Sequence, residues 1–89
     1  MLTDELTPQE KELLVITMEE CSELAMACSK LLRFGKSEYN MENLQTESAD
    51  VTVMVNLLAD FKLISYIGKL EQMFEKKDKL LEYSSLFDN

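Results

Sequence analysis

The feature that most constrains this chain is the spacing of its few helix-breaking residues. Its 89 residues include only two glycines and one proline. Thr7 can cap a helix, Pro8 suits the first helical position, and Glu10 completes a capping box. The next residue that breaks helices is Gly35, which can adopt the left-handed conformation that ends a helix. This spacing predicts a first helix over residues 8–33.

A second helix is predicted shortly after the first one ends. Asn40 is a good N-cap, and residues that favour helix continue from 41 to about 60. Because the connection is short and polar, the two helices are expected to pack antiparallel. Residues 61–68 have no clean apolar period and are predicted to form a turn or a short helix.

Apolar residues at helical spacing predict a third helix over 69–83. The chain is long enough for one domain, residues 1–89, but so short a chain leaves much apolar surface that is hard to bury alone. We therefore expect an all-α, antiparallel bundle of three to four helices that is completed by oligomerisation.

Charge and hydropathy exclude several classes of protein. The formal net charge of −8 would repel a phosphate backbone, so a broad nucleic-acid-binding surface is not expected. The longest apolar run is far short of the ~20 residues that span a bilayer, and the first five residues lack the pattern of a signal peptide. We expect no membrane association and a cytoplasmic location.

The two cysteines do not suggest redox or nucleophilic chemistry. Cys21 and Cys28 are seven residues apart in the first predicted helix, about 10.5 Å along its axis, which exceeds the ~7 Å Cα separation of a disulfide. We expect two reduced thiols that pack as small apolar groups. The chain contains no histidine, so a Cys–His nucleophile is excluded.

The most informative residues are acids that lie where the helices should be apolar. Glu20 shares a face with apolar residues of the first helix, with Glu23 at the edge of that face: Leu13, Ile16, Leu24, Ala27 and Leu31. Glu47 and Asp50 occupy the apolar side of the second helix in the same way. Four carboxylates between two helices cannot all stay ionised without compensation. Oxygen ligands without histidine favour Mg²⁺, or Mn²⁺, over zinc; the alternative is that these acids face solvent or pair with lysines.

These acids resemble the signature of a known family. Glu19-Glu20-Cys21-Ser22-Glu23 and Glu47-Ser48-Ala49-Asp50 are similar to the two halves, E-E-x-x-E and E-x-x-D, of the MazG-like all-α nucleoside triphosphate pyrophosphohydrolases. The segment that ends at Gly35 resembles the S-K-x-L-R-F-G stretch of phage-type members. The resemblance covers roughly residues 16–60.

The resemblance implies a reaction and a division of roles. Glu20, Glu23, Glu47 and Asp50 would bind Mg²⁺, and Glu19 would act with Glu20 in catalysis by positioning water. The reaction would be hydrolysis of an NTP or dNTP between its α- and β-phosphates, giving a nucleoside monophosphate and pyrophosphate. It would take place in the cytoplasm of a bacterium. If the protein is encoded by a phage, this is the cytoplasm of the host.

Basic residues are expected to hold the phosphates of the substrate. Lys30 and Arg33 follow the first acid pair, and Lys76 and Lys79 resemble the family's late K-x-x-K element; the alternative for each lysine is a solvated surface charge. The expected partners are the nucleoside triphosphate and further copies of the chain, in a homodimer or homotetramer. Two other functions are open: a non-catalytic helical regulatory or binding module, and an acidic protein that binds a basic partner.

Overall fold

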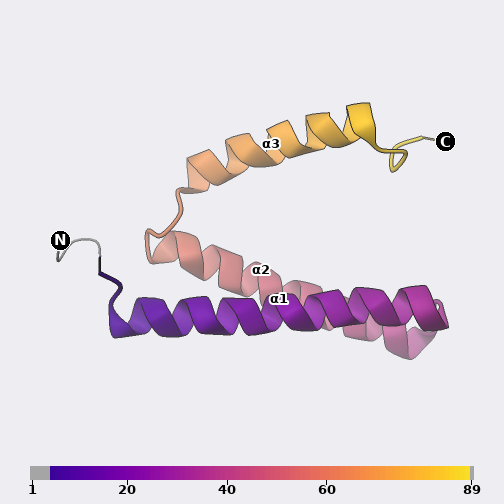
Figure 1. Ribbon diagram of the computed structural model, residues 1–89, viewed down its shortest axis with the longest axis horizontal. Coiled ribbons are helices and arrows are strands. Elements are labelled where there is room, and N and C mark those ends of the chain that lie inside the picture. Colours follow the sequence, from indigo (N-terminus) through magenta and orange to yellow (C-terminus); the bar gives the residue numbers. More distant parts are fainter. Residues whose placement is uncertain (1–4, 89) are drawn as a thin grey trace.

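The computed structural model describes residues 5–88, which form three α-helices and no strand (Figure 1). α1 spans Pro8–Phe34, α2 spans Glu38–Asp60 and α3 spans Tyr66–Tyr83. The predicted all-α fold is confirmed. None of these helices is both long enough and apolar enough to cross a membrane. The expectation about a signal peptide concerns residues 1–4 above all, and these lie outside the described residues.

α1 begins and ends where the sequence predicts, to within one residue. The Glu10 N–H donates to Thr7 Oγ1 at 3.1 Å, and the Thr7 N–H donates to Glu10 Oε1 at 2.8 Å, so the capping box is complete. At the other end, the Gly35 N–H donates to the Leu31 carbonyl at 2.9 Å. Gly35 has φ 83, a backbone conformation that glycine adopts without strain, and the helix ends there.

α2 begins three residues earlier than predicted, because the N-cap is Ser37 and not Asn40. The hydroxyl of Ser37 accepts a hydrogen bond from the Asn40 N–H at 3.1 Å. Asn40 is buried in the first turn, where its side-chain amide donates to the Gly35 carbonyl at 3.2 Å. Serine and asparagine are about equally good N-caps, so composition alone could not choose between them.

α3 also begins three residues earlier than predicted. The Gly68 N–H donates to Ser65 Oγ at 3.0 Å, which makes Ser65 the N-cap and places Gly68 in the first turn of the helix. The connection between α2 and α3 is therefore only residues 61–65. Within it, Lys62 has φ 62, which is a conformation that residues with a Cβ rarely adopt.

α1 and α2 pack against each other as an antiparallel hairpin, and α3 lies apart from it (Figure 1). The buried apolar side chains among the described residues all belong to α1 and α2: Leu13, Ala27, Met54 and Ala59. α3 contributes no buried side chain. The prediction that helices pack against each other is confirmed, and the extensive contact is the one between α1 and α2.

The chain is more extended than a compact domain of its length. Its Cα radius of gyration is 16.3 Å, with principal extents of 49 × 31 × 17 Å, whereas a compact domain of this length would have a radius of gyration of about 12 Å. Large apolar side chains are exposed along α3: Tyr66, Ile67, Leu70, Met73, Phe74 and Leu81. A single chain therefore leaves much of its apolar surface uncovered.

The expectation that the cysteines pack as small apolar groups is wrong for the single chain. Cys21 and Cys28 are free thiols, as expected, but both are exposed on the surface of α1. They lie on a side of the helix that α2 does not cover.

Candidate metal centre

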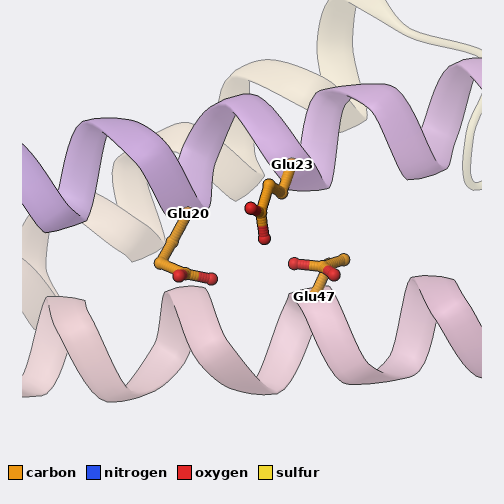
Figure 2. Close-up of side chains that lie close together, drawn as sticks. All are labelled: Glu20, Glu23 and Glu47. Atoms are coloured by element: carbon orange, nitrogen blue, oxygen red, sulfur yellow. The ribbon is translucent and has the colours of Figure 1, made fainter.

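Acidic side chains of α1 and α2 converge between the two helices. Figure 2 shows Glu20 and Glu23 extending from α1 toward Glu47 of α2. Each of the three offers a carboxylate oxygen within 4.8 Å of the other two. Asp50, one turn after Glu47, is close enough for its charge to act on Glu20. The four acids that the sequence singles out are thus brought together.

The register of the two helices explains this convergence. Glu20 is half-buried and lies on the face of α1 that carries Leu13 and Ala27, which are buried seven residues before and after it. Glu47 is half-buried on the face of α2 that carries the buried Met54. The second acid of each pair is exposed at the edge of the helix contact. The apolar side chains that join the helices therefore also hold the acids opposite one another.

Two oxygens of the cluster are buried without a hydrogen-bond partner. They are Oε2 of Glu20 and Oε2 of Glu47. A buried carboxylate oxygen without a donor is destabilising, and such atoms are uncommon in folded proteins unless an ion or water satisfies them. A divalent cation would give both oxygens a partner, because hard cations prefer carboxylate oxygens as ligands. The three carboxylate oxygens lie within 4.8 Å of one another, so Glu20, Glu23 and Glu47 would hold such an ion together.

Burial and the mutual repulsion of the acids together raise the pKa of Glu20 and of Glu47. Partial burial contributes most to raising the pKa of Glu20 above its ordinary value of 4.5, and the charges of Glu23, Asp50 and Glu19 raise it further. Burial likewise raises the pKa of Glu47, together with a hydrogen bond that protonated Glu47 can donate to Glu23. The raised pKa of each glutamate indicates a site in which additional negative charge is unfavourable and a bound cation would be favourable.

A cavity of about 310 Å³ opens beside the acids. It is lined by Glu23, Met26, Lys30, Asn43 and Glu47. Among the residues that the sequence predicts to bind phosphate, Lys30 therefore lines the same cavity as two candidate metal ligands, Glu23 and Glu47. Asn43 was not predicted from the sequence, although its place one turn before Glu47 is a signal that could have identified it.

The other expected site residues lie farther out. Glu19 is exposed beside Glu20, and its charge acts on that side chain. Arg33 is exposed in the last turn of α1, with its guanidinium 5.1 Å from the centre of the Phe34 ring. Lys76 and Lys79 are exposed on α3, and α3 has no extensive contact with α1 or α2. The single chain thus does not bring these two lysines to the acids.

A larger cavity, of about 600 Å³, lies at the turn between α2 and α3. Its one carboxylate is that of Asp60, which accepts a hydrogen bond from the Tyr66 hydroxyl. That hydrogen bond is also the main reason why the pKa of Tyr66 is raised. The acid in this cavity already has a donor, so the acid cluster between α1 and α2 is the better candidate for a functional site.

Comparison of the chain with models of known protein families, with curated proteins and with solved structures gave no match. Its function must therefore be inferred from its own residues.

Proposed function

We propose that this protein is a Mg²⁺-dependent pyrophosphohydrolase of the MazG-like type, which hydrolyses an NTP or dNTP between the α- and β-phosphates. The observation that carries the proposal is the pair of buried carboxylate oxygens, on Glu20 and Glu47, that accept no hydrogen bond. An acidic surface that is merely solvated has water on its oxygens. These two oxygens are buried instead, in side chains that lie among other carboxylates, and such an arrangement is stabilised by a bound cation.

Four side chains would hold the ion: Glu20, Glu23, Glu47 and Asp50. They supply only oxygen ligands, which suits Mg²⁺ and allows Mn²⁺ in its place. When bound, the ion would shield the charge of the phosphates and lower the pKa of the attacking water. The exposure of Glu23 and Asp50 leaves the site open on one side, where a nucleotide can reach it.

The remaining residues of the site have roles that follow from their charge and position. In the hydrolysis, the oxygen of water forms a bond to the phosphorus of either the α- or the β-phosphate. The bond from that same phosphorus to the bridging oxygen breaks, and the bridging oxygen leaves with the other phosphate. The carboxylate of Glu19, exposed beside Glu20, can accept the proton that the water loses. The ammonium of Lys30 lies in the cavity next to the acids and can donate hydrogen bonds to a phosphate oxygen. Arg33, one turn later on α1, can add a further donor.

Lys76 and Lys79 would complete the phosphate contacts from α3. Because α3 stands apart from the acid cluster in the chain, this role requires α3 to approach the acids when the nucleotide binds, or to reach the acids of another copy. The two lysines are one turn apart and can point in the same direction.

The test is a panel of NTPs and dNTPs incubated with the protein and Mg²⁺, with pyrophosphate as the measured product. We expect pyrophosphate from at least one nucleotide, and loss of this activity in Glu20→Gln and in Asp50→Asn, which keep the side-chain volume but remove a charged ligand. The matched control is Glu42→Gln, an exposed acid of α2 outside the cluster, which should retain activity. Equal activity in Glu20→Gln and the control would refute the site.

Pyrophosphate release, measured together with the melting temperature in the presence and absence of Mg²⁺, separates an enzyme from a non-catalytic module on this scaffold. Both functions predict that Mg²⁺ raises the melting temperature, since a ligand that binds only the folded state stabilises it. Only the enzyme releases pyrophosphate. A rise in melting temperature without pyrophosphate from any nucleotide would favour the binding module, and the absence of both would overturn the metal centre.

A further inference from the structure

A cavity of about 260 Å³ lies between α1 and α2, close to the start of α1 and the end of α2. Its lining is mostly apolar and comes from both helices and from the residue that caps α2: Leu13, Ile16, Met54, Leu57 and Phe61. Leu13 and Met54 belong to the buried core, whereas Phe61 is 43% exposed. The space therefore extends from the core of the hairpin to its surface, where a small molecule can enter. We call it the apolar cavity.

The apolar cavity lies on the same side of the hairpin as the acid cluster. Three residues of α1 follow one another at intervals of seven: Ile16, Glu23 and Lys30. Three residues of α2 do the same: Asn43, Asp50 and Leu57. An interval of seven residues displaces a side chain by only about 20° around a helix and by about 10.5 Å along it. Because the helices are antiparallel, both series connect in the same spatial order the apolar cavity, an acid of the cluster and the cavity of about 310 Å³ that contains Lys30, which we call the Lys30 cavity.

The acids therefore stand between two cavities of different character. The Lys30 cavity has an ammonium group and an amide, from Lys30 and Asn43, next to the candidate metal ligands Glu23 and Glu47. Among residues 5–88, none that lines the apolar cavity is basic. An anionic group is stabilised in the first cavity, whereas in the second it would lose water without compensation. A ligand that is charged at one end and apolar at the other fits this arrangement in one direction.

We propose that the apolar cavity binds the base of the nucleotide substrate. This inference rests on the proposed hydrolysis of an NTP or dNTP, and it adds the direction in which the substrate lies along the two helices. The bond that breaks joins the α- and β-phosphates, so these two groups must lie at the metal. The nucleoside and the γ-phosphate then extend from the metal in opposite directions. The γ-phosphate extends into the Lys30 cavity, and the nucleoside extends toward the apolar cavity.

The lining of the apolar cavity suits the chemistry of a base. A base has two apolar ring faces and an edge of hydrogen-bond donors and acceptors. Phe61 is the aromatic residue of the lining, and its ring can stack on one face of the base. The polar residues of the lining, Gln9 and Glu12, are exposed, so that their amide and carboxylate groups can form hydrogen bonds with the edge. Binding sites for small molecules typically combine an apolar lining with a few such polar groups.

The larger cavity at the turn between α2 and α3 is less suited to the base. It is lined by Ala59, whereas the apolar cavity is lined by Leu57. Side chains two residues apart on a helix are separated by about 160° around its axis, so the two cavities lie on opposite sides of α2. A nucleotide bound at the acids extends along the side that carries Asp50 and Leu57, and it does not reach the cavity at the turn.

Tyr39 lies near the start of α2, beyond the Lys30 cavity, and offers a competing position for the base. It is 72% exposed and lines a cavity of about 220 Å³ together with other residues of α2. Asn43 belongs both to this cavity and to the Lys30 cavity. A base beside Tyr39 would reverse the nucleotide and place the γ-phosphate against apolar side chains, which is unfavourable. Tyr39 is therefore the matched control for Phe61.

Tryptophan fluorescence tests the position of the base directly. The chain contains no tryptophan, so Phe61→Trp and Tyr39→Trp each introduce a single reporter at one of the two positions. The ligands, all added with Mg²⁺, are inorganic triphosphate, which lacks a base, and the α,β-methylene analogues of ATP, GTP, CTP and UTP, which cannot be hydrolysed between the α- and β-phosphates. We expect at least one analogue to quench the fluorescence of Phe61→Trp by stacking, while inorganic triphosphate leaves it unchanged. In Tyr39→Trp the analogues and inorganic triphosphate should have the same effect.

Isothermal titration calorimetry with the same ligands measures what the ring of Phe61 contributes. Phe61→Ala should weaken binding of the analogue about 5- to 150-fold, which is the range for removal of one stacked aromatic side chain, and should leave the affinity for inorganic triphosphate unchanged. The second result also shows that the variant is folded and that its acids still bind. Phe61→Trp keeps an aromatic ring and should retain the affinity for the analogue. Tyr39→Ala should bind both ligands as the unmodified chain does.

The base site is overturned if Phe61→Ala loses affinity for both ligands, if it loses affinity for neither, or if no analogue binds the unmodified chain. Fluorescence quenching in Tyr39→Trp that only the analogues cause would place the base at the other end of the helices and overturn the proposal as well. Release of pyrophosphate by the unmodified chain alongside any of these results would leave the enzyme intact and remove only the base site. The expected binding results without release of pyrophosphate would keep the base site and overturn the hydrolysis.

Discussion

Replacing Ala27 with leucine tests whether the contact between α1 and α2 is what holds the acids together. Ala27 is only 1% exposed and lies one turn after Glu23, on the face that meets α2. The three additional carbon atoms of leucine have no free space there, so the helices must move apart or the side chain must adopt a strained rotamer. Such overpacking typically destabilises a protein by about 1–3 kcal/mol. In a domain of this size, each kcal/mol lowers the melting temperature by about 4–8 °C.

Melting followed by circular dichroism at 222 nm measures the effect, and Ala49→Leu is the control. Ala49 is exposed on α2, so leucine there should change the stability by no more than about 0.5 kcal/mol. Separating the helices also moves Glu23 away from Glu47, and the rise in melting temperature on adding Mg²⁺ should therefore be smaller in Ala27→Leu. Equal melting temperatures for the two variants would show that the contact at Ala27 is not close packed, and an unchanged response to Mg²⁺ would show that it does not align the acids.

Three further predictions concern the charges of the site. The pKa values of Glu20 and Glu47 are raised in the folded state, so the melting temperature of the metal-free protein should fall as the pH rises from about 4.5 through the raised values. In Glu20→Gln the melting temperature should depend less on pH. A melting temperature that increases over this range would contradict the raised pKa values. Lys30→Ala should raise the Michaelis constant for the nucleotide or lower the rate, by about 1–3 kcal/mol in transition-state free energy, and it should leave the response of the melting temperature to Mg²⁺ unchanged. The double variant Lys76→Ala, Lys79→Ala should behave in the same way if α3 reaches the phosphates, whereas unchanged steady-state kinetics would assign the phosphate contacts to α1 alone.

Local sequence signals predicted the boundaries of the helices where one residue alone could serve as the cap. Thr7 and Gly35 have no competitor nearby, and α1 ends within one residue of the prediction. At the start of α2 the sequence offers two caps three residues apart, Ser37 and Asn40. The choice was decided by burial of Asn40 and its hydrogen bond to the Gly35 carbonyl, which no local propensity describes.

Gly68 misled the prediction for a related reason. Glycine disfavours the interior of a helix, so the sequence placed the start of the third helix after it. In the structure Gly68 occupies the first turn, where its N–H is satisfied by the Ser65 hydroxyl. The penalty for glycine was outweighed by a cap that lies three residues upstream.

The convergence of the acids could be predicted because it depends on helical period and on one antiparallel contact. Glu20 and Glu47 interrupt apolar faces, and two interrupted faces that pack together must bring their acids close. The position of α3 could not be predicted in this way. The spacing of its apolar residues shows that one face of α3 should be buried, but this spacing does not identify the surface that buries it. Within the chain, α1 and α2 bury little of that face.

The absence of buried side chains in α3 means that the molecule has two levels of stability. An isolated helix of 18 residues is only marginally stable in water, whereas the helices of the hairpin separate only when their shared core opens. The backbone amides of α3 are therefore expected to exchange with deuterium well before those at the centre of α1 and α2, by local unfolding that leaves the hairpin folded. Any molecule that covers α3 would slow this exchange, so its amides report binding to that helix without a label.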